Sequence, residues 1–150
     1  MEIQSDFKDL LELFNSHKIE YLIVWGYALV HHGAPRYTGD IDLFVRPDPE
    51  NAKHIIKALD DFGFSSLGLT KEDFMEPGQI VQLGKPPGRV DIITSISGVT
   101  WDEENNGKIE GTCDGVPVHF VGREQFVKNK TATGRAKDLV DLESLGEKTK

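Results

Sequence analysis

Cysteine is almost absent from this chain, since Cys113 is the only one among 150 residues. A single thiol forms no internal disulfide and no cysteine-based zinc cluster, which fits a reducing cytoplasm. The sequence also lacks an apolar run long enough to span a bilayer. Its start, MEIQSDFKDLLELF, has no basic segment followed by an apolar one. We therefore expect a cytoplasmic protein without a signal peptide and without a membrane partner.

Positive charge is scarce, with 17 Lys and Arg against 25 Asp and Glu, and the formal net charge is −8. Non-specific binding along a nucleic-acid backbone depends on Lys and Arg, so this balance argues against duplex DNA as a partner. It leaves room for a nucleotide or for one end of an RNA, particularly where metal ions neutralise an acidic site. If RNA binds, the expected contact is the basic group Arg123, Lys128 and Lys130.

The composition is otherwise that of a globular protein. Hydrophobic residues make up 38% of the chain and charged residues 28%, values that exclude a disordered chain. A length of 150 residues suits one hydrophobic core. Because no repeat, low-complexity tract or linker interrupts the sequence, we expect a single domain over residues 1–150.

The hydrophobic pattern predicts a mixed α/β (α+β) fold, in which helices pack on a mixed twisted sheet. Helices are expected over residues 6–18, with Ser5 as N-cap, and over 27–34, 50–63, 123–130 and 134–146. Strands are expected over 19–26, 41–45, 78–84 and 89–96, followed by a hairpin over 108–122 that turns at Asp114–Gly115.

Two acids in the segment TGDIDLFV interrupt the strand pattern around them. Alternate residues of a strand share a face, so Asp40 and Asp42 place two carboxylates side by side, where like charges destabilise each other. Asp91 repeats the anomaly inside the apolar segment GRVDIITSI. If the two strands pair, three carboxylates converge, and a hard divalent cation such as Mg²⁺ neutralises them. The alternative is that these acids cap turns or pair with Arg36 or Arg89.

The segment LIVWGYALVHHGAPRYTGDIDLFV resembles the first motif of nucleotidyltransferases of the DNA polymerase beta-like superfamily. In that motif an apolar strand ends in Gly-Gly or Gly-Ser, a short helix follows, and Asp-x-Asp lies on the next strand. VDII around Asp91 resembles the family's third carboxylate strand, and GRAKDLVDLESL resembles a C-terminal helix. The chain is most similar to small bacterial members related to abortive-infection type toxins, which implies an antitoxin partner.

The resemblance implies transfer of a nucleoside monophosphate from an NTP to an acceptor, with release of pyrophosphate. Asp40, Asp42 and Asp91 are then the catalytic and metal-binding residues, holding two Mg²⁺ ions or Mn²⁺, and Asp91 helps to deprotonate the acceptor hydroxyl. The acceptor stays open between an RNA end, a protein hydroxyl and a small molecule such as an aminoglycoside-type antibiotic. The alternative is a catalytically weakened nucleotide-binding or protein-interaction module that retains the fold.

Further residues are expected to bind the nucleotide. Gly26 and Tyr27 begin the short helix and lie against the triphosphate, because a backbone without Cβ allows close approach and helix N–H groups bind anions. Arg36 contacts phosphate oxygens or neutralises the acids, and Thr38 caps a turn or meets the phosphates. Lys137 belongs to a solvated salt-bridge face of its helix, or it reaches the triphosphate, as the resemblance suggests.

Trp25 departs from the motif, because the family has glycine at this position. An indole here crowds the triphosphate, stacks on a base or rotates into the core. We expect Trp25 to border the nucleotide site and to weaken triphosphate binding relative to glycine. Arg89 follows the KPPG turn, and a surface role is expected for it rather than contact with substrate.

Overall fold

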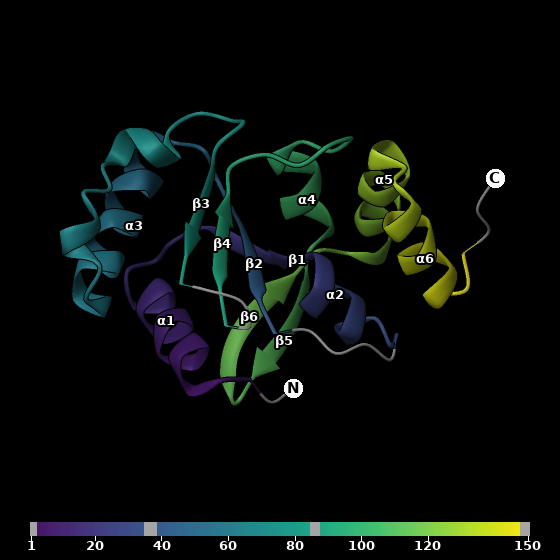
Figure 1. Cartoon of the computed structure of the whole chain (residues 1–150), viewed down its shortest axis with the longest axis horizontal. Coiled ribbons are helices and arrows are strands. Elements are labelled where there is room, and N and C mark those ends of the chain that lie inside the picture. Colours follow the sequence, from purple (N-terminus) through teal and green to yellow (C-terminus); the bar gives the residue numbers. More distant parts are fainter. Residues whose placement is uncertain (1–2, 35–38, 85–87, 148–150) are drawn as a thin grey trace.

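The computed structural model describes residues 3–34, 39–84 and 88–147. Among these residues, one mixed sheet has the strand order β3-β4-β2-β1-β6-β5 and is surrounded by helices (Figure 1). The strands are β1 (Tyr21–Val24), β2 (Ile41–Val45), β3 (Ile80–Leu83), β4 (Val90–Ile93), β5 (Ile109–Cys113) and β6 (Val116–Phe120). The helices are α1 (Ser5–Ser16), α2 (Trp25–His31), α3 (Pro49–Phe62), α4 (Trp101–Gly107), α5 (Arg123–Thr133) and α6 (Ala136–Ser144), with two short 3-10 helices, η1 (Ser65–Leu67) and η2 (Lys71–Phe74). The predicted mixed α/β fold is confirmed.

The centre of the sheet combines parallel and antiparallel pairs. Strand β2 runs antiparallel to β1 and parallel to β4, and β1 runs parallel to β6. In the β2–β4 pair, Asp42 lies opposite Asp91. Since side chains of directly opposed residues point to the same face, the two predicted site strands bring their carboxylates together.

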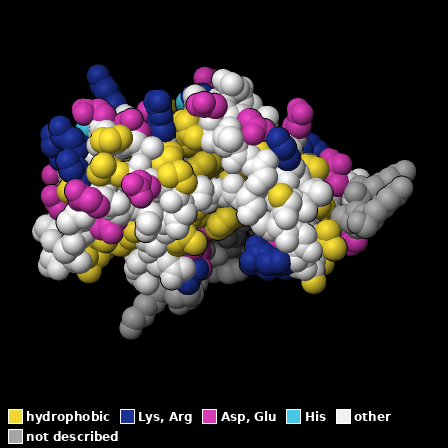
Figure 2. Space-filling view, turned by 90° about the horizontal axis from the view of Figure 1, so that it is seen from above, with side chains coloured by type: hydrophobic (Ala, Val, Ile, Leu, Met, Phe, Trp, Pro, Cys, Tyr) yellow, Lys and Arg dark blue, Asp and Glu magenta, His cyan; other side chains and the backbone are white. Residues whose placement is uncertain are grey.

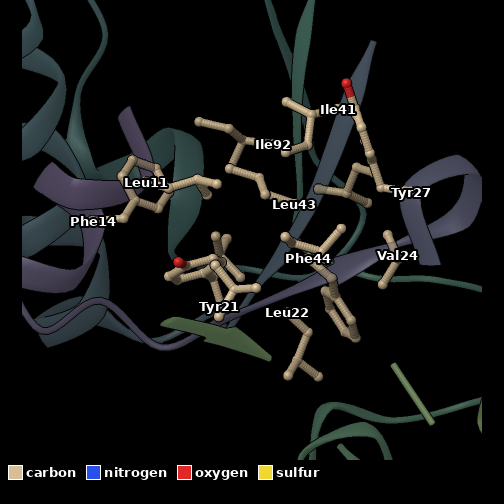
Figure 3. Packing of buried hydrophobic residues seen from close by; sticks show 14 of the residues in the cluster. Leu11, Phe14, Tyr21, Leu22, Val24, Tyr27, Ile41, Leu43, Phe44 and Ile92 are labelled. Atoms are coloured by element: carbon tan, nitrogen blue, oxygen red, sulfur yellow. The ribbon is translucent and has the colours of Figure 1, made fainter. Parts of the chain in front are cut away.

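One hydrophobic cluster extends from Phe7 of α1 to Leu142 of α6. Its middle is formed by side chains of the sheet, among them Leu43, Phe44 and Ile92, with side chains of α1 at one side (Figure 3). Helix α1 forms because its apolar residues recur on one face, and that face is buried. The helices α1 and α3 lie at one end of the molecule and α5 and α6 at the other (Figure 1).

The predicted end of α3 at Gly63 and the predicted hairpin turn are confirmed, whereas the cap at the start of α3 was not predicted. The side chain of Asp48 accepts a hydrogen bond from the backbone N–H of Asn51 at the start of α3, and Gly63, with a φ of 103°, ends that helix. The β5–β6 hairpin turns at Asp114 and Gly115, whose φ angles are 48° and 82°. Positive φ at both turn residues is the geometry of a tight two-residue hairpin.

Two local predictions are wrong, and one helix was missed. Gln4, not Ser5, is the N-cap of α1, and it makes no side-chain capping bond. Strand β1 ends at Val24, and Trp25 already belongs to α2, because a φ of 57° at Trp25 turns the chain out of the strand. Helix α4 was not predicted, although Thr100 and Glu103 form a capping box at its start.

The surface carries charges of both signs. On the face shown in Figure 2, acidic and basic side chains are interspersed, and the described Lys and Arg form no continuous stripe. Within the described ranges, no helix combines the length and the apolar character needed to cross a bilayer.

Candidate active site

The three predicted carboxylates line one cavity of about 470 Å³. Asp42 lies on β2 and Asp91 on β4, while Asp40 comes directly before β2. We call these three residues the carboxylate cluster. The cavity is also lined by residues of four other elements, α2, β3, α5 and α6, and of the loops beside them: Trp25, Gly26, Gly39, Ile80, Gln82, Arg89, Lys130, Arg135, Lys137 and Asp141. Its volume lies within the range of small-molecule sites, roughly 300–1,000 Å³.

The surroundings of Asp42 disfavour its charged form. Burial of its carboxyl group raises its pKa to about 7, with further contributions from the charge of Asp91, a hydrogen bond with Asp91 and the charge of Asp40, against the opposing charge of Arg89. In a folded protein, such a raised pKa means that the ionised form is disfavoured. The cluster therefore has a deficit of positive charge.

Arg89 supplies part of that charge. Its Nε and Nη2 atoms donate to the two carboxylate oxygens of Asp91 at 2.7 and 3.0 Å, and Nη2 lies 3.9 Å from Oδ2 of Asp40. Asp40 Oδ1 accepts the backbone N–H groups of Gly88 and Arg89 at 3.0 and 2.9 Å. The expected surface role of Arg89 is therefore wrong, and the alternative in which acids cap a turn or pair with Arg89 is realised at Asp40 and Asp91.

The donor set of the cluster fits a hard cation, since it consists of carboxylate oxygens, the ligands that Mg²⁺ prefers. Within the described ranges, however, no three His, Cys, Asp or Glu side chains are grouped so that they could hold a metal ion together. The bidentate pair with Arg89 engages both oxygens of Asp91. Full coordination by the cluster requires that Arg89 release Asp91.

The cavity is also lined by three cations, which we call the cationic side: Lys130 of α5, Arg135 of the α5–α6 loop and Lys137 of α6. Lys130 Nζ lies 3.2 Å from Asp138 and 3.1 Å from Asp141, and its side chain is 5% exposed. Lys137 is exposed and makes no ion pair with any described residue. The predicted salt-bridge face of α6 is thus buried rather than solvated, while Lys137 itself faces the cavity.

Asp138 of α6 accepts hydrogen bonds that connect α6 to α5, and these bonds affect its pKa. Burial alone raises the pKa of its carboxyl group, but hydrogen bonds from Arg135, Thr133 and Lys130 lower it well below its usual range. The carboxylate is fully buried. Asp138 is therefore a structural anion that holds α5 and α6 together.

The basic group predicted to contact RNA does not form a free surface. Lys130 is buried in its ion pairs, Lys128 pairs with Glu103, and Arg123 pairs with Glu147. Because each cation already has an anionic partner, this placement of an RNA contact is not supported by the geometry.

The remaining predicted residues separate into three groups. Trp25 and Gly26 line the cavity. Tyr27 is 5% exposed, packs edge-on against Phe7 and belongs to the hydrophobic cluster (Figure 3), so its side chain does not line the cavity. Arg36 and Thr38 lie outside the described residues.

Three residues that line the cavity were not predicted from the sequence: Ile80, Gln82 and Arg135. Ile80 and Gln82 lie on the same face of β3, and Gln82 is opposite Asp91 in the β3–β4 pair. Alternation along the strand predicts that shared face, but only strand order places it beside Asp91. Arg135 gave no signal, because its position depends on how α5 and α6 dock.

Comparisons with known proteins identify the fold. No protein-family model matches the chain, and no curated protein matches it either. Among solved structures, a proposed nucleotidyltransferase from Thermotoga maritima is 16% identical, with a TM-score of 0.61 over 91% of this chain and 88% of that one. The lincosamide antibiotic adenylyltransferase LnuA, in its lincomycin-bound crystal structure, is 15% identical, with a TM-score of 0.58 over 98% and 99% of the two chains. The chain therefore has the fold of these nucleotidyltransferases.

Proposed function

We propose that this protein is a metal-dependent nucleotidyltransferase that transfers a nucleoside monophosphate from an NTP to an acceptor hydroxyl. The observation that carries the proposal is that the carboxylate cluster and the cationic side line the same cavity. A triphosphate needs positive charge around its oxygens, and the carboxylates suit Mg²⁺. The shared fold with an adenylyltransferase supports the same reaction class.

In this proposal Asp40, Asp42 and Asp91 hold Mg²⁺, as two ions, or Mn²⁺. When bound, the metal neutralises charge on the triphosphate and on the reacting oxygens. The acceptor oxygen forms a bond to the α-phosphorus, and the bond from that phosphorus to the bridging oxygen breaks, so pyrophosphate leaves with the electron pair. Once Arg89 has released the carboxylate of Asp91, that carboxylate accepts the proton of the acceptor hydroxyl.

The cationic side binds the triphosphate, with Lys137 as the side chain that is free to do so, while Gly26 lets the donor approach the backbone closely. Arg36 and Thr38 are proposed as further donor contacts from the segment before the carboxylate cluster. These roles place the donor between α2 and α6.

We propose that the acceptor is a small hydroxyl-bearing molecule rather than an RNA end or a protein hydroxyl. LnuA, matched over 99% of its length, is described with bound lincomycin. The net charge of −8 and the paired state of Arg123 and Lys128 disfavour RNA. A kinship with abortive-infection toxins, an antitoxin partner and a cytoplasmic location are carried over as proposals from the motif resemblance.

The test is incubation of the purified protein and Mg²⁺ with each α-³²P-labelled NTP, in the presence of lincomycin, total RNA or cell protein. Labelled product and released pyrophosphate, both lost on Asp42→Asn, are the expected result. The rival is an interaction module without catalysis, in which Trp25 closes the site. Absence of NTP-induced thermal stabilisation with all four nucleotides, together with no labelled product, would overturn the proposal and favour that rival.

A further inference from the structure

Trp25 has a backbone conformation that a bulky residue rarely adopts. Its φ is 57°, in the left-handed region, and it connects β1 directly to α2. Glycine occupies this region without cost, whereas a side chain with a Cβ is strained there. Such strain persists only where surrounding contacts hold the residue in place. The contacts of the indole therefore explain why Trp25 is tolerated.

The indole points to α5. Its Nε1–H donates to Oδ1 of Asn129 at 3.0 Å. Asn129 is 2% exposed, and its Nδ2 donates in turn to the backbone oxygen of Ser97 at 2.8 Å. The ammonium of Lys130 lies 5.8 Å from the centroid of the indole ring, within the range of a cation–π contact. One side chain thus meets two successive residues of α5.

These contacts continue to α6. Lys130 bridges Asp138 and Asp141, which are fully buried and 5% exposed, respectively. Asp138 also accepts from Thr133 of α5. Because buried ion pairs with satisfied hydrogen bonds have well-defined geometry, the position of Lys130 fixes that of α6.

We propose that Trp25 is a positioning residue: through Asn129 and Lys130 it holds α5 and α6 against the carboxylate edge of the sheet. It thereby sets the distance at which the cationic side, and Lys137 above all, meets the triphosphate. This inference rests on the proposed function where it concerns the nucleotide. It reverses the expectation that glycine at position 25 tightens triphosphate binding, since the indole is turned toward α5.

Two variants test this role. Trp25→Gly removes both contacts but also relieves the strained φ, so its urea midpoint should change little. The affinity of this variant is measured by calorimetry with each of the four nucleotides. For the best-binding Mg²⁺–NTP it should fall roughly tenfold, which corresponds to the loss of the hydrogen bond and the cation–π contact between Trp25 and α5. Trp25→Phe keeps a ring but loses the donor and should bind about threefold more weakly.

A readout without nucleotide separates this inference from the proposed function. Amide hydrogen exchange in α5 and α6 should become faster in both variants, while α1 and α3, at the far end of the molecule, serve as the internal control. Unchanged exchange in α5 and α6 would overturn the positioning role, whether or not wild type binds NTP. Equal or tighter NTP binding by a folded Trp25→Gly would overturn it as well. If wild type binds no NTP but exchange responds as expected, the proposed function fails and the positioning role stands. If Trp25→Gly does not fold, Trp25→Phe decides both measurements.

Discussion

Asp42 and Asp91 lie opposite each other in the parallel pair of β2 and β4, and burial together with this proximity raises the pKa of Asp42 to about 7. Like charges at directly opposed strand positions destabilise a sheet. Phe44 shares a face of β2 with Asp42 and is buried, so a hydrophobic residue would be compatible with this face of the strand. The pair therefore weakens the metal-free protein, as expected of residues retained for binding rather than for folding.

Replacing Asp42 by Asn should abolish nucleotidyl transfer and stabilise the metal-free protein. Because the pKa of Asp42 is higher in the folded than in the unfolded state, the protonated carboxyl group contributes to the free energy of unfolding. This contribution is present below about pH 4 and is lost as pH rises through about 7. At pH 8 the variant should thus be more stable than wild type by about 1–2 kcal/mol, and at pH 4 the two should be similar. Urea unfolding in EDTA at both pH values measures this difference.

Asp60→Asn is the matched control for that experiment, because Asp60 is exposed on α3, away from the cavity. It should leave stability unchanged within about 0.5 kcal/mol. Were Asp42→Asn as unstable as wild type at pH 8, the proposed repulsion within the carboxylate cluster would be refuted.

We expect Glu104 of α4 to cause a second dependence of stability on pH. It is 0% exposed, neither carboxyl oxygen has a hydrogen-bond partner among the described residues, and burial raises its pKa to about 8. Its protonated form is therefore favoured by folding, and stability is lost as pH rises from about 4.5 to about 8. Glu104→Gln should be more stable than wild type by about 2 kcal/mol at pH 9, with little difference at pH 4.

Chemical denaturation across this pH range, on Glu104→Gln and on the exposed control Glu12→Gln, measures the effect. Equal pH profiles for wild type and Glu104→Gln would show that Glu104 has a partner or water that satisfies it. Because Glu104 does not line the cavity, this variant should keep its NTP affinity.

We expect Arg89 to compete with the metal ion for the carboxylate of Asp91. Its bidentate pair with Asp91 engages both oxygens that a cation needs. Arg89→Ala should therefore bind Mn²⁺ in the absence of nucleotide more tightly than wild type, by roughly threefold to tenfold, which corresponds to about 1 kcal/mol. Mn²⁺ titration followed by electron paramagnetic resonance gives the affinity directly.

Arg46→Ala is the control, because Arg46 pairs with Glu20 on the surface and has the same charge. It should leave Mn²⁺ affinity unchanged. Weaker Mn²⁺ binding by Arg89→Ala would mean that Arg89 organises the carboxylates for the metal rather than competing with it.

The sequence was sufficient for the fold because its signals are local. Gly63 marks the C-terminal end of α3, and short apolar runs mark the buried central strands. The carboxylate cluster was also predictable, since acids inside apolar strands are destabilising unless something binds them.

The cationic side was not predictable in the same way. Lys130 and Asp141 are eleven positions apart in sequence, and their ion pair forms only because α5 and α6 pack against each other. The same holds for Trp25, whose partner Asn129 is 104 positions away. Burial, which turns a helical charge pattern from a solvated face into an internal network, depends on docking and leaves no periodic signal in the sequence.

The two lysines of the cationic side should behave in opposite ways. Lys137 is exposed in the cavity and makes no ion pair with the described residues, so Lys137→Ala should keep the stability of wild type while its KM for NTP rises about tenfold. Lys130 neutralises two buried carboxylates, so Lys130→Ala should lose about 3–5 kcal/mol of stability. Urea unfolding and calorimetric titration with Mg²⁺–NTP separate the two effects. Unchanged NTP affinity in Lys137→Ala would remove this residue from the donor site, and a stable Lys130→Ala would show that Asp138 is held by Arg135 and Thr133 without it.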